Sequence, residues 1–179
     1  MTIINGLAEG TWAIDPSHSE VSFQVRHLMV SKVRGSFTGF SGSIVVGADD
    51  ASVTVDIDPA TINTRDEGRD QHVRSGDFFD VENHPSWTFV SRAVAVSGNE
   101  LKITGDLTMR GTTKSVVLEG EFLGVNSDPW GNTKAGFEAS TTVNRKEFGI
   151  EWNAPLETGG VLVGEDVKIS LEIQAALQK

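Results

Sequence analysis

Alternation of apolar and polar residues with a period of two dominates this chain. The stretch 18–30 is an example, because its apolar face carries Val21, Phe23, Val25 and His27 while the other face is polar. A period of two is typical of a β-strand with one buried face. The pattern therefore predicts an all-β protein.

Eight segments carry this alternation, and a short extra strand is predicted at 11–14. The eight are 18–30, 36–46, 51–58, 86–96, 100–109, 114–125, 134–145 and 165–177. The residues 47–50 and 97–99 between neighbouring segments have the composition of hairpin turns. Strands with one apolar face must bury those faces together, so the choice is between a sandwich and a closed antiparallel barrel.

The predicted inward faces combine aromatic and small side chains. One strand presents Trp87, Phe89, Ser91, Ala93 and Ala95, and another presents Ala135, Phe137, Ala139, Thr141 and Val143. Small inward residues leave volume, which in a closed eight-stranded barrel can hold one small ligand. The alternative is that bulky residues on facing strands fill this volume, and one sequence does not reveal which strands face each other.

The segment 64–80, called the lid segment below, interrupts the strand pattern. Its first residues, 64–67, have the form of a capping box, in which Thr64 caps a helix and Glu67 reaches back. This predicts a short helix from about 65 to 73 or 74, which Gly76 ends. The pair Phe78 and Phe79 must then be buried, so we interpret the segment as a helical crossover that covers one end of the barrel. The alternative is a crossover packed on the outside.

Composition and charge narrow the class of protein. A length of 179 residues favours one domain over 1–179, and 19 glycines suit strands and turns. The formal net charge of −10 disfavours nucleic acid and anionic lipid head groups as partners. The absence of cysteine excludes disulfides and thiolate chemistry. The chain has no apolar run of about 18 residues and no signal-peptide pattern at its start, so we expect a cytoplasmic protein without stable membrane insertion.

The candidate chemical groups do not form a known catalytic or metal-binding motif. His72 and His84 lie among acidic residues, but their spacing fits no standard zinc pattern, so we predict no metal site. No glycine-rich phosphate loop follows a strand, which leaves nucleotide cofactors without support. His18 follows a turn and is expected to hydrogen-bond within it rather than to belong to a catalytic triad. His27 lies on an apolar face, where it either satisfies a local carboxylate or carbonyl or meets the polar head of a ligand.

Several short patterns, taken in order, are similar to those of one family. They are Trp12-x-Ile14-Asp15-x-x-His18-Ser19, Val21-x-Phe23-x-Val25-x-His27, Gly35-Ser36-Phe37, Thr61-Ile62-x-Thr64, Arg69-Asp70-x-His72, Asp77-Phe78-Phe79-Asp80, Phe89-x-Ser91, Gly105-Asp106-Leu107-Thr108, Gly111-x-Thr113-Lys114 and Asn144-Arg145-x-x-Phe148-Gly149. Each is weak alone, but their ordered sum from about 12 to 173 resembles the YceI-like proteins.

The resemblance implies an eight-stranded, lipocalin-like barrel with a short helical segment near one end. It also implies a bound amphiphile with a long apolar tail, typically a polyisoprenoid or an isoprenoid quinone, and it suggests a homodimer. Many members of the family are exported to the periplasm.

Strand parity and this resemblance together predict a ligand-binding site without a catalytic residue. The expected apolar lining consists of Phe23, Val25, Phe37, Phe79, Trp87, Phe89, Leu107, Phe137 and Phe148. His27 or a group within 69–80 is expected to meet the ligand head. The protein is thus predicted to store or transport a long-chain isoprenoid or fatty ligand and not to be an enzyme. The alternatives are a metal-assisted enzyme that uses the His and Asp residues of the lid segment, and a stress or interaction module without a ligand.

Overall fold

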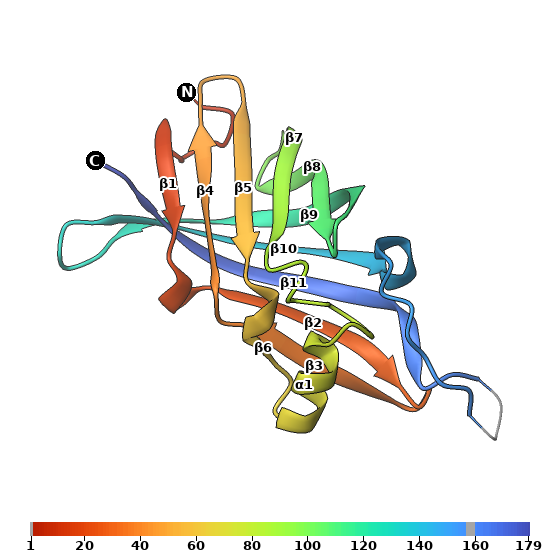
Figure 1. Ribbon diagram of the computed structural model, residues 1–179. Helices are drawn as coiled ribbons and strands as arrows, with labels where there is room; N and C mark the ends of the chain where they lie inside the picture. Colours follow the sequence, from red (N-terminus) through yellow and green to blue (C-terminus); the bar gives the residue numbers. More distant parts are fainter. Residues whose placement is uncertain (1, 157–159) are drawn as a thin grey trace.

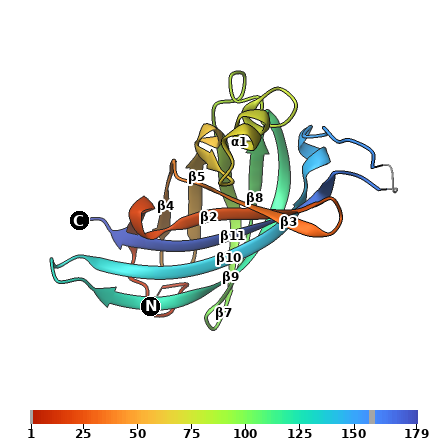
Figure 2. The same cartoon turned by 90° about the horizontal axis from the view of Figure 1, so that it is seen from below.

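The protein is a closed antiparallel β-barrel in the computed structural model, which describes residues 2–156 and 160–179 (Figures 1 and 2). The strands are β1 (Gly10–Ile14), β2 (Glu20–His27), β3 (Ser31–Phe37), β4 (Phe40–Val46), β5 (Ala51–Ile57), β6 (Ile62–Asn63), β7 (Trp87–Ser97), β8 (Glu100–Met109), β9 (Thr112–Ser127), β10 (Thr133–Asn144) and β11 (Val163–Leu177). Eight of them form a ring in the order β1-β4-β5-β7-β8-β9-β10-β11, and β1 pairs with β11 to close it. The predicted eight-stranded barrel is confirmed.

The long strand β11 connects the ring to a second part of the wall. Its last residues pair with β1, whereas the segment from Val163 to Glu172 pairs with β2. The wall therefore continues past the ring as the strands β2, β3 and β6. Figure 1 shows the helix α1 (Glu67–Arg74) beside β3 and β6, at the end of the molecule away from the two termini.

The start of α1 differs from the prediction. Asp66 is the N-cap, and its carboxylate accepts a hydrogen bond from the Arg69 amide at 3.0 Å. The prediction that Thr64 caps the helix was wrong, because Arg65 has a φ of +67°, which is incompatible with a right-handed helix at that residue. Thr64 is instead buried, and its amide and hydroxyl donate to Asp70 Oδ1 at 3.0 and 2.5 Å.

The rest of the lid segment folds over the barrel interior as expected. Phe78 and Phe79 are both buried, and the Phe79 ring lies 4.5 Å from that of Trp87 and 6.2 Å from that of Phe37. Arg74 donates from Nε to the Ala60 carbonyl at 2.9 Å, which ties the helix to the segment before β6. The alternative of a crossover packed on the outside is wrong.

Two strand boundaries were mispredicted near the start of the chain. The expected strand 18–30 ends at His27, and the chain turns through Leu28 and Met29, which have φ values of +54° and +62°. The expected strand 36–46 is split between β3 and β4. The turn was missed because its residues are apolar and continue the strand composition instead of breaking it.

A bulge in β7 changes which residues face inward. The register with β8 shifts between Ser91 and Ala93, so the alternation reverses past this point. Ala93 and Ala95 are therefore exposed, contrary to the prediction, and Val94 faces the interior instead. The inward face predicted for β10 is confirmed, since Ala135, Phe137 and Val143 are buried.

Candidate ligand-binding cavity

The barrel interior contains an apolar cavity of about 410 Å³. Ligand pockets commonly measure about 300–1,000 Å³. The cavity runs from Ile4 and Ile44 near the N-terminal end of the ring to the lid segment. The side chains of the facing strands therefore leave the interior partly open. Strand alternation alone had not decided whether bulky residues fill it.

Nine of the ten predicted site residues line this cavity. They are Phe23, Val25, His27, Phe37, Phe79, Trp87, Phe89, Leu107 and Phe137. Phe148 is buried but does not belong to the lining. It lies on the 3-10 helix η3 (Arg145–Phe148), where the alternation of a strand no longer determines the direction of a side chain. That these residues bind a ligand stays a prediction.

Other lining residues were not singled out from the sequence. On β8 and β11 the cavity is lined by Leu101, Ile103, Val167, Ile169, Leu171 and Ile173. These residues alternate with polar ones, so the period-two signal that identified the strands also marks their inward faces. Trp152 and Leu162 lie in an irregular segment, where no such period exists.

The cavity lining is mainly apolar, and its few polar side chains lie toward one end. Arg26 and Glu138 border the cavity too, but both are exposed and alternate with inward residues, so their side chains lie on the outer face of β2 and β10. The other charged and histidine residues of the lining gather at the end under the lid segment, and they are His27, Arg69, His72 and Arg145. The opposite end is lined by Ile4, Ile44, Val53 and Leu101. A site with this asymmetry can hold a molecule that has a polar head and an apolar tail.

The polar side chains of the lid segment are held in place by one another. Arg69 donates from Nε to the Thr64 hydroxyl at 2.8 Å and from Nη2 to the Thr64 carbonyl at 2.7 Å. His72 Nε2 lies 2.8 Å from Asp77 Oδ2, and the imidazole ring makes an edge contact with the Trp152 ring, with centroids 4.8 Å apart. These contacts fix the polar end of the cavity before any ligand arrives.

Arg145 places a buried cation at the same end. Its guanidinium donates to the carbonyl oxygens of Gly164, Ile150, Trp152 and Val163 at 2.7 to 3.3 Å. Burial lowers the pKa of Arg145, and the nearby charge of Glu165 opposes this shift. An arginine stays protonated in proteins, so the polar end of the cavity carries a fixed positive charge.

His27 is the predicted head-group residue with the least local support. Its ring is half-buried at the cavity wall and makes no hydrogen bond within residues 2–156 and 160–179. We also considered that a neighbouring carboxylate or carbonyl would hydrogen-bond the His27 ring. The described residues show no such partner.

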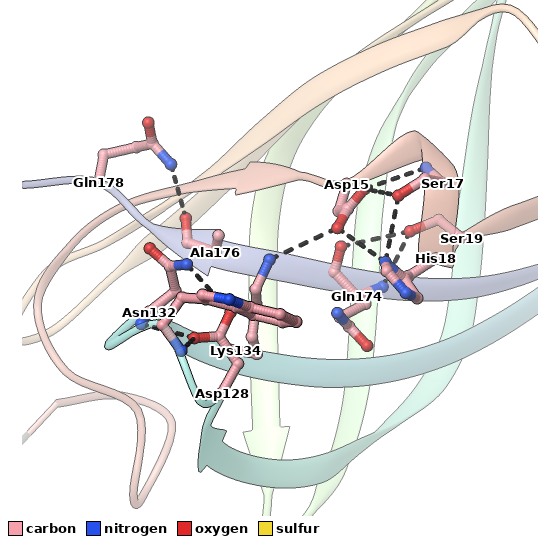
Figure 3. Close-up of polar contacts among 11 residues, drawn as sticks. Asp15, Ser17, His18, Ser19, Asp128, Asn132, Lys134, Gln174, Ala176 and Gln178 are labelled. Atoms are coloured by element: carbon pink, nitrogen blue, oxygen red, sulfur yellow. Dashed lines mark hydrogen bonds and ion pairs between the residues drawn. The ribbon is translucent and has the colours of Figure 1, made fainter.

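A separate cluster of Asp15, Ser17 and His18 lies outside the cavity (Figure 3). Asp15 accepts hydrogen bonds from the Ser17 amide and hydroxyl at 3.0 and 2.6 Å, and it contacts His18 Nδ1 at 3.0 Å and Lys134 Nζ at 3.4 Å. The bonds from Ser17 and His18 hold the pKa of Asp15 far below its usual range. Ser17 and Asp15 both meet the same nitrogen of His18, which is not the arrangement of a catalytic triad. The expected structural role of His18 in the turn is confirmed.

The other histidines form separate pairs with single carboxylates. His84 Nε2 lies 3.9 Å from Asp80 Oδ2, whereas His72 contacts Asp77. Within the described residues, no three His, Asp or Glu side chains gather in a way that could hold a metal ion. In this same part of the chain, no helix is long and apolar enough to cross a membrane.

Comparison with known proteins identifies the family. Residues 12–175 match the model of the YceI-like domain. The chain belongs to the YceI-like family. A UPF0312 protein of Staphylococcus aureus strain USA300 is 40% identical over 172 residues, which cover 94% of this chain and 98% of that relative.

Solved structures of YceI-like barrels superpose on this chain. BcnA of Burkholderia cenocepacia matches with a TM-score of 0.76 and 25% identity, over 90% of this chain and 98% of BcnA. A polyisoprenoid binding domain from Saccharophagus degradans matches with a TM-score of 0.74 over 93% of this chain and 98% of that domain. Its identity is 13%, so this second match concerns the fold alone.

Proposed function

We propose that this YceI-like protein binds a long-chain amphiphilic lipid of the polyisoprenoid or isoprenoid quinone class in its barrel, and that it stores or transports this lipid. The observation that carries the proposal is the polarity of the cavity, which is apolar along the ring and cationic under the lid segment. In this arrangement the tail lies among the strand side chains and the head lies near Arg69, His72 and Arg145.

The energetics of such a site depend on the tail. Each methylene removed from water contributes about 0.8 kcal/mol, so a five-carbon isoprene unit contributes about 4 kcal/mol before the costs of binding. A tail of several units thus binds through buried area with little directional contact. The polar end then supplies discrimination between head groups, because a buried donor without an acceptor is costly.

The family adds support at a coarser level. The Saccharophagus degradans domain is named as a polyisoprenoid binding domain, and it shares the barrel fold with this chain. A fold can host several functions, so the weight of the proposal rests on the cavity of this chain and not on that name. The mainly apolar lining of the cavity favours binding over catalysis.

A pair of adjacent substitutions tests whether the cavity holds the ligand. Thr141 lines the cavity, whereas the next residue of β10, Thr142, is exposed on the outer face. The same bulky residue is placed at each position as Thr141→Trp and Thr142→Trp. After delipidation, binding of solanesol, menaquinone and palmitate is measured by calorimetry.

We expect Thr141→Trp to weaken binding of at least one isoprenoid by about tenfold or more, since the indole occupies tail volume and displaces two or more methylenes. Thr142→Trp should bind as the unmodified protein does. Equal binding by both variants, or no binding of any of the three compounds to the unmodified protein, contradicts the proposal. Thermal melting of both variants serves as the check on folding.

A further inference from the structure

The turn of the β2–β3 hairpin exposes three apolar side chains in succession. Leu28, Met29 and Val30, called the tip below, are 42%, 54% and 82% exposed. Figures 1 and 2 both show this hairpin projecting at the end of the molecule away from the two termini. Exposed apolar side chains that cluster at the end of a hairpin indicate an interaction surface for a protein or a membrane.

The backbone of the tip makes its apolar residues more unusual. The Val30 amide donates to the His27 carbonyl at 3.2 Å, and both central residues, Leu28 and Met29, have positive φ. Turns in which both central residues have positive φ favour Asn and Gly, because side chains with a Cβ rarely adopt positive φ. The chain thus keeps leucine and methionine where local turn chemistry and solubility both favour polar or small residues. Departures from local rules of this kind are expected at functional sites.

Basic residues surround the tip. Arg26, Lys32 and Arg34, called the basic collar below, lie on the outer face of the two strands, and Arg26 is directly opposite Lys32. None of the ion pairs between described residues involves them. No acidic residue occurs between Glu20 and Asp49, although the whole chain has a formal net charge of −10. Two cations that lie opposite each other, with no counterion among the described residues, are unfavourable in an isolated hairpin, and they favour an anionic partner.

The hairpin is continuous with the cavity. Val25, His27 and Val33 lie at the base of the hairpin and also line the cavity. Leu162 and Val163 line it from the neighbouring segment, and the Leu28 amide donates to the Leu162 carbonyl at 2.8 Å. A body that covers the tip therefore lies next to the polar end of the cavity.

We propose that the tip and its basic collar dock the protein on the surface of an anionic phospholipid membrane. The apolar tip enters the boundary between head groups and acyl chains, and Arg26, Lys32 and Arg34 meet the lipid phosphates. The negative charge of the rest of the chain is repelled by the same surface, so the molecule docks with the hairpin first and the polar end of the cavity facing the lipid. The net charge of the chain disfavours anionic head groups as partners. The basic collar is an exception, because its local charge is positive and attracts such head groups. The docking goes beyond the proposed function and does not require a loaded cavity.

The decisive variant is Leu28→Asn/Met29→Gly, which places the preferred turn residues at the two positions of positive φ. We expect its melting temperature to equal or exceed that of the unmodified protein, so loss of docking does not reflect loss of folding. Flotation is measured with vesicles of equal parts phosphatidylcholine and phosphatidylglycerol, and with vesicles of phosphatidylcholine alone. The unmodified protein should float with the anionic vesicles and bind the neutral ones less, and the variant should bind the anionic vesicles at least about tenfold less.

Matched controls lie at the other end of the barrel. Trp130 is 82% exposed in the β9–β10 turn, and Trp130→Ser should leave vesicle binding unchanged. Lys32→Glu and Lys179→Glu change the net charge equally, but Lys179 follows the far end of β11. We expect about fivefold or greater loss of binding from Lys32→Glu and no comparable loss from Lys179→Glu.

The proposal is overturned if the unmodified protein binds anionic vesicles no better than neutral ones, or if Leu28→Asn/Met29→Gly binds them as well as the unmodified protein. It is also overturned if sedimentation shows a dimer that this variant dissociates and no vesicle binding, since the tip would then cover a second copy of the chain. The lipid content of each purified variant is measured in parallel. Retained lipid with lost flotation separates failure of docking from failure of the proposed cavity function.

Discussion

Replacing Arg145 tests whether the polar end of the cavity is held together by one buried side chain. The substitution Arg145→Met keeps an unbranched, apolar stem and removes all of the donors of the guanidinium. Four carbonyl oxygens accept from the guanidinium, and they come from η3's neighbouring loop and from the start of β11. The side chain therefore connects the end of β10 to residues 150–152 and to the start of β11.

The expected loss in the free energy of unfolding depends on which of the four carbonyls keep another hydrogen-bond donor. The Val163 carbonyl keeps a second donor, the Asn153 Nδ2 at 2.7 Å. The carbonyls of Ile150 and Trp152 have no other donor within residues 2–156 and 160–179. Leaving a buried acceptor unpaired costs about 1–3 kcal/mol. Of these two hydrogen bonds only the one to Ile150 is buried, so we predict a loss of about 1–3 kcal/mol in the free energy of unfolding.

Urea denaturation at neutral pH measures this loss. The matched control is Lys146→Met on the next residue of η3, whose exposed ion pair with Glu165 at 3.1 Å contributes at most about 1 kcal/mol. A loss for Arg145→Met that is no larger than that of Lys146→Met would refute the reasoning. Such a result would mean that residues 150–152 do not depend on the guanidinium for their position.

Three further predictions concern stability. Glu138 lies directly opposite both Glu121 and Glu172 on the outer face, so Glu138→Gln should raise the free energy of unfolding by about 0.2–1 kcal/mol in low salt, and a smaller gain in high salt would confirm an electrostatic cause. The hydrogen bonds from Ser17 and His18 depress the pKa of Asp15 in the folded state, so its contribution is present above the unfolded pKa of about 3.9 and is lost as the pH falls further. The stability difference between the unmodified protein and Asp15→Asn should thus shrink below about pH 4, and a difference that does not change with pH would contradict this assignment. Asp66→Ala removes the N-cap of α1 and should cost about 1 kcal/mol, which urea denaturation can resolve.

The regular part of the fold was predictable because strand alternation is a local property. The inward residues of β10 were correct along its length, and with them most of the apolar lining was identified. The burial of Phe78 and Phe79 followed from their size alone. Family resemblance then supplied the closed barrel, which the alternation by itself left open against a sandwich.

The errors share a different physical origin. The bulge at Arg92 shifts the pairing of β7 with β8, so that the residues after it face the opposite side of the sheet. No nearby residue type predicts this bulge. Arg65 adopts positive φ because Thr64 is held by the buried Asp70, a contact six residues away that overrides the capping pattern. The turn at Leu28 and Met29 lacks turn residues altogether. In each case the structure departs from local preference, and one sequence does not reveal where such departures occur.

The measurement that tests the central claim most directly is native mass spectrometry of the freshly purified protein, followed by organic extraction and identification of what is released. We expect a stoichiometric species with a long isoprenoid or related apolar tail. A clean mass of the protein alone, unchanged after incubation with solanesol, menaquinone and palmitate, would contradict the claim that the cavity is a lipid-binding site.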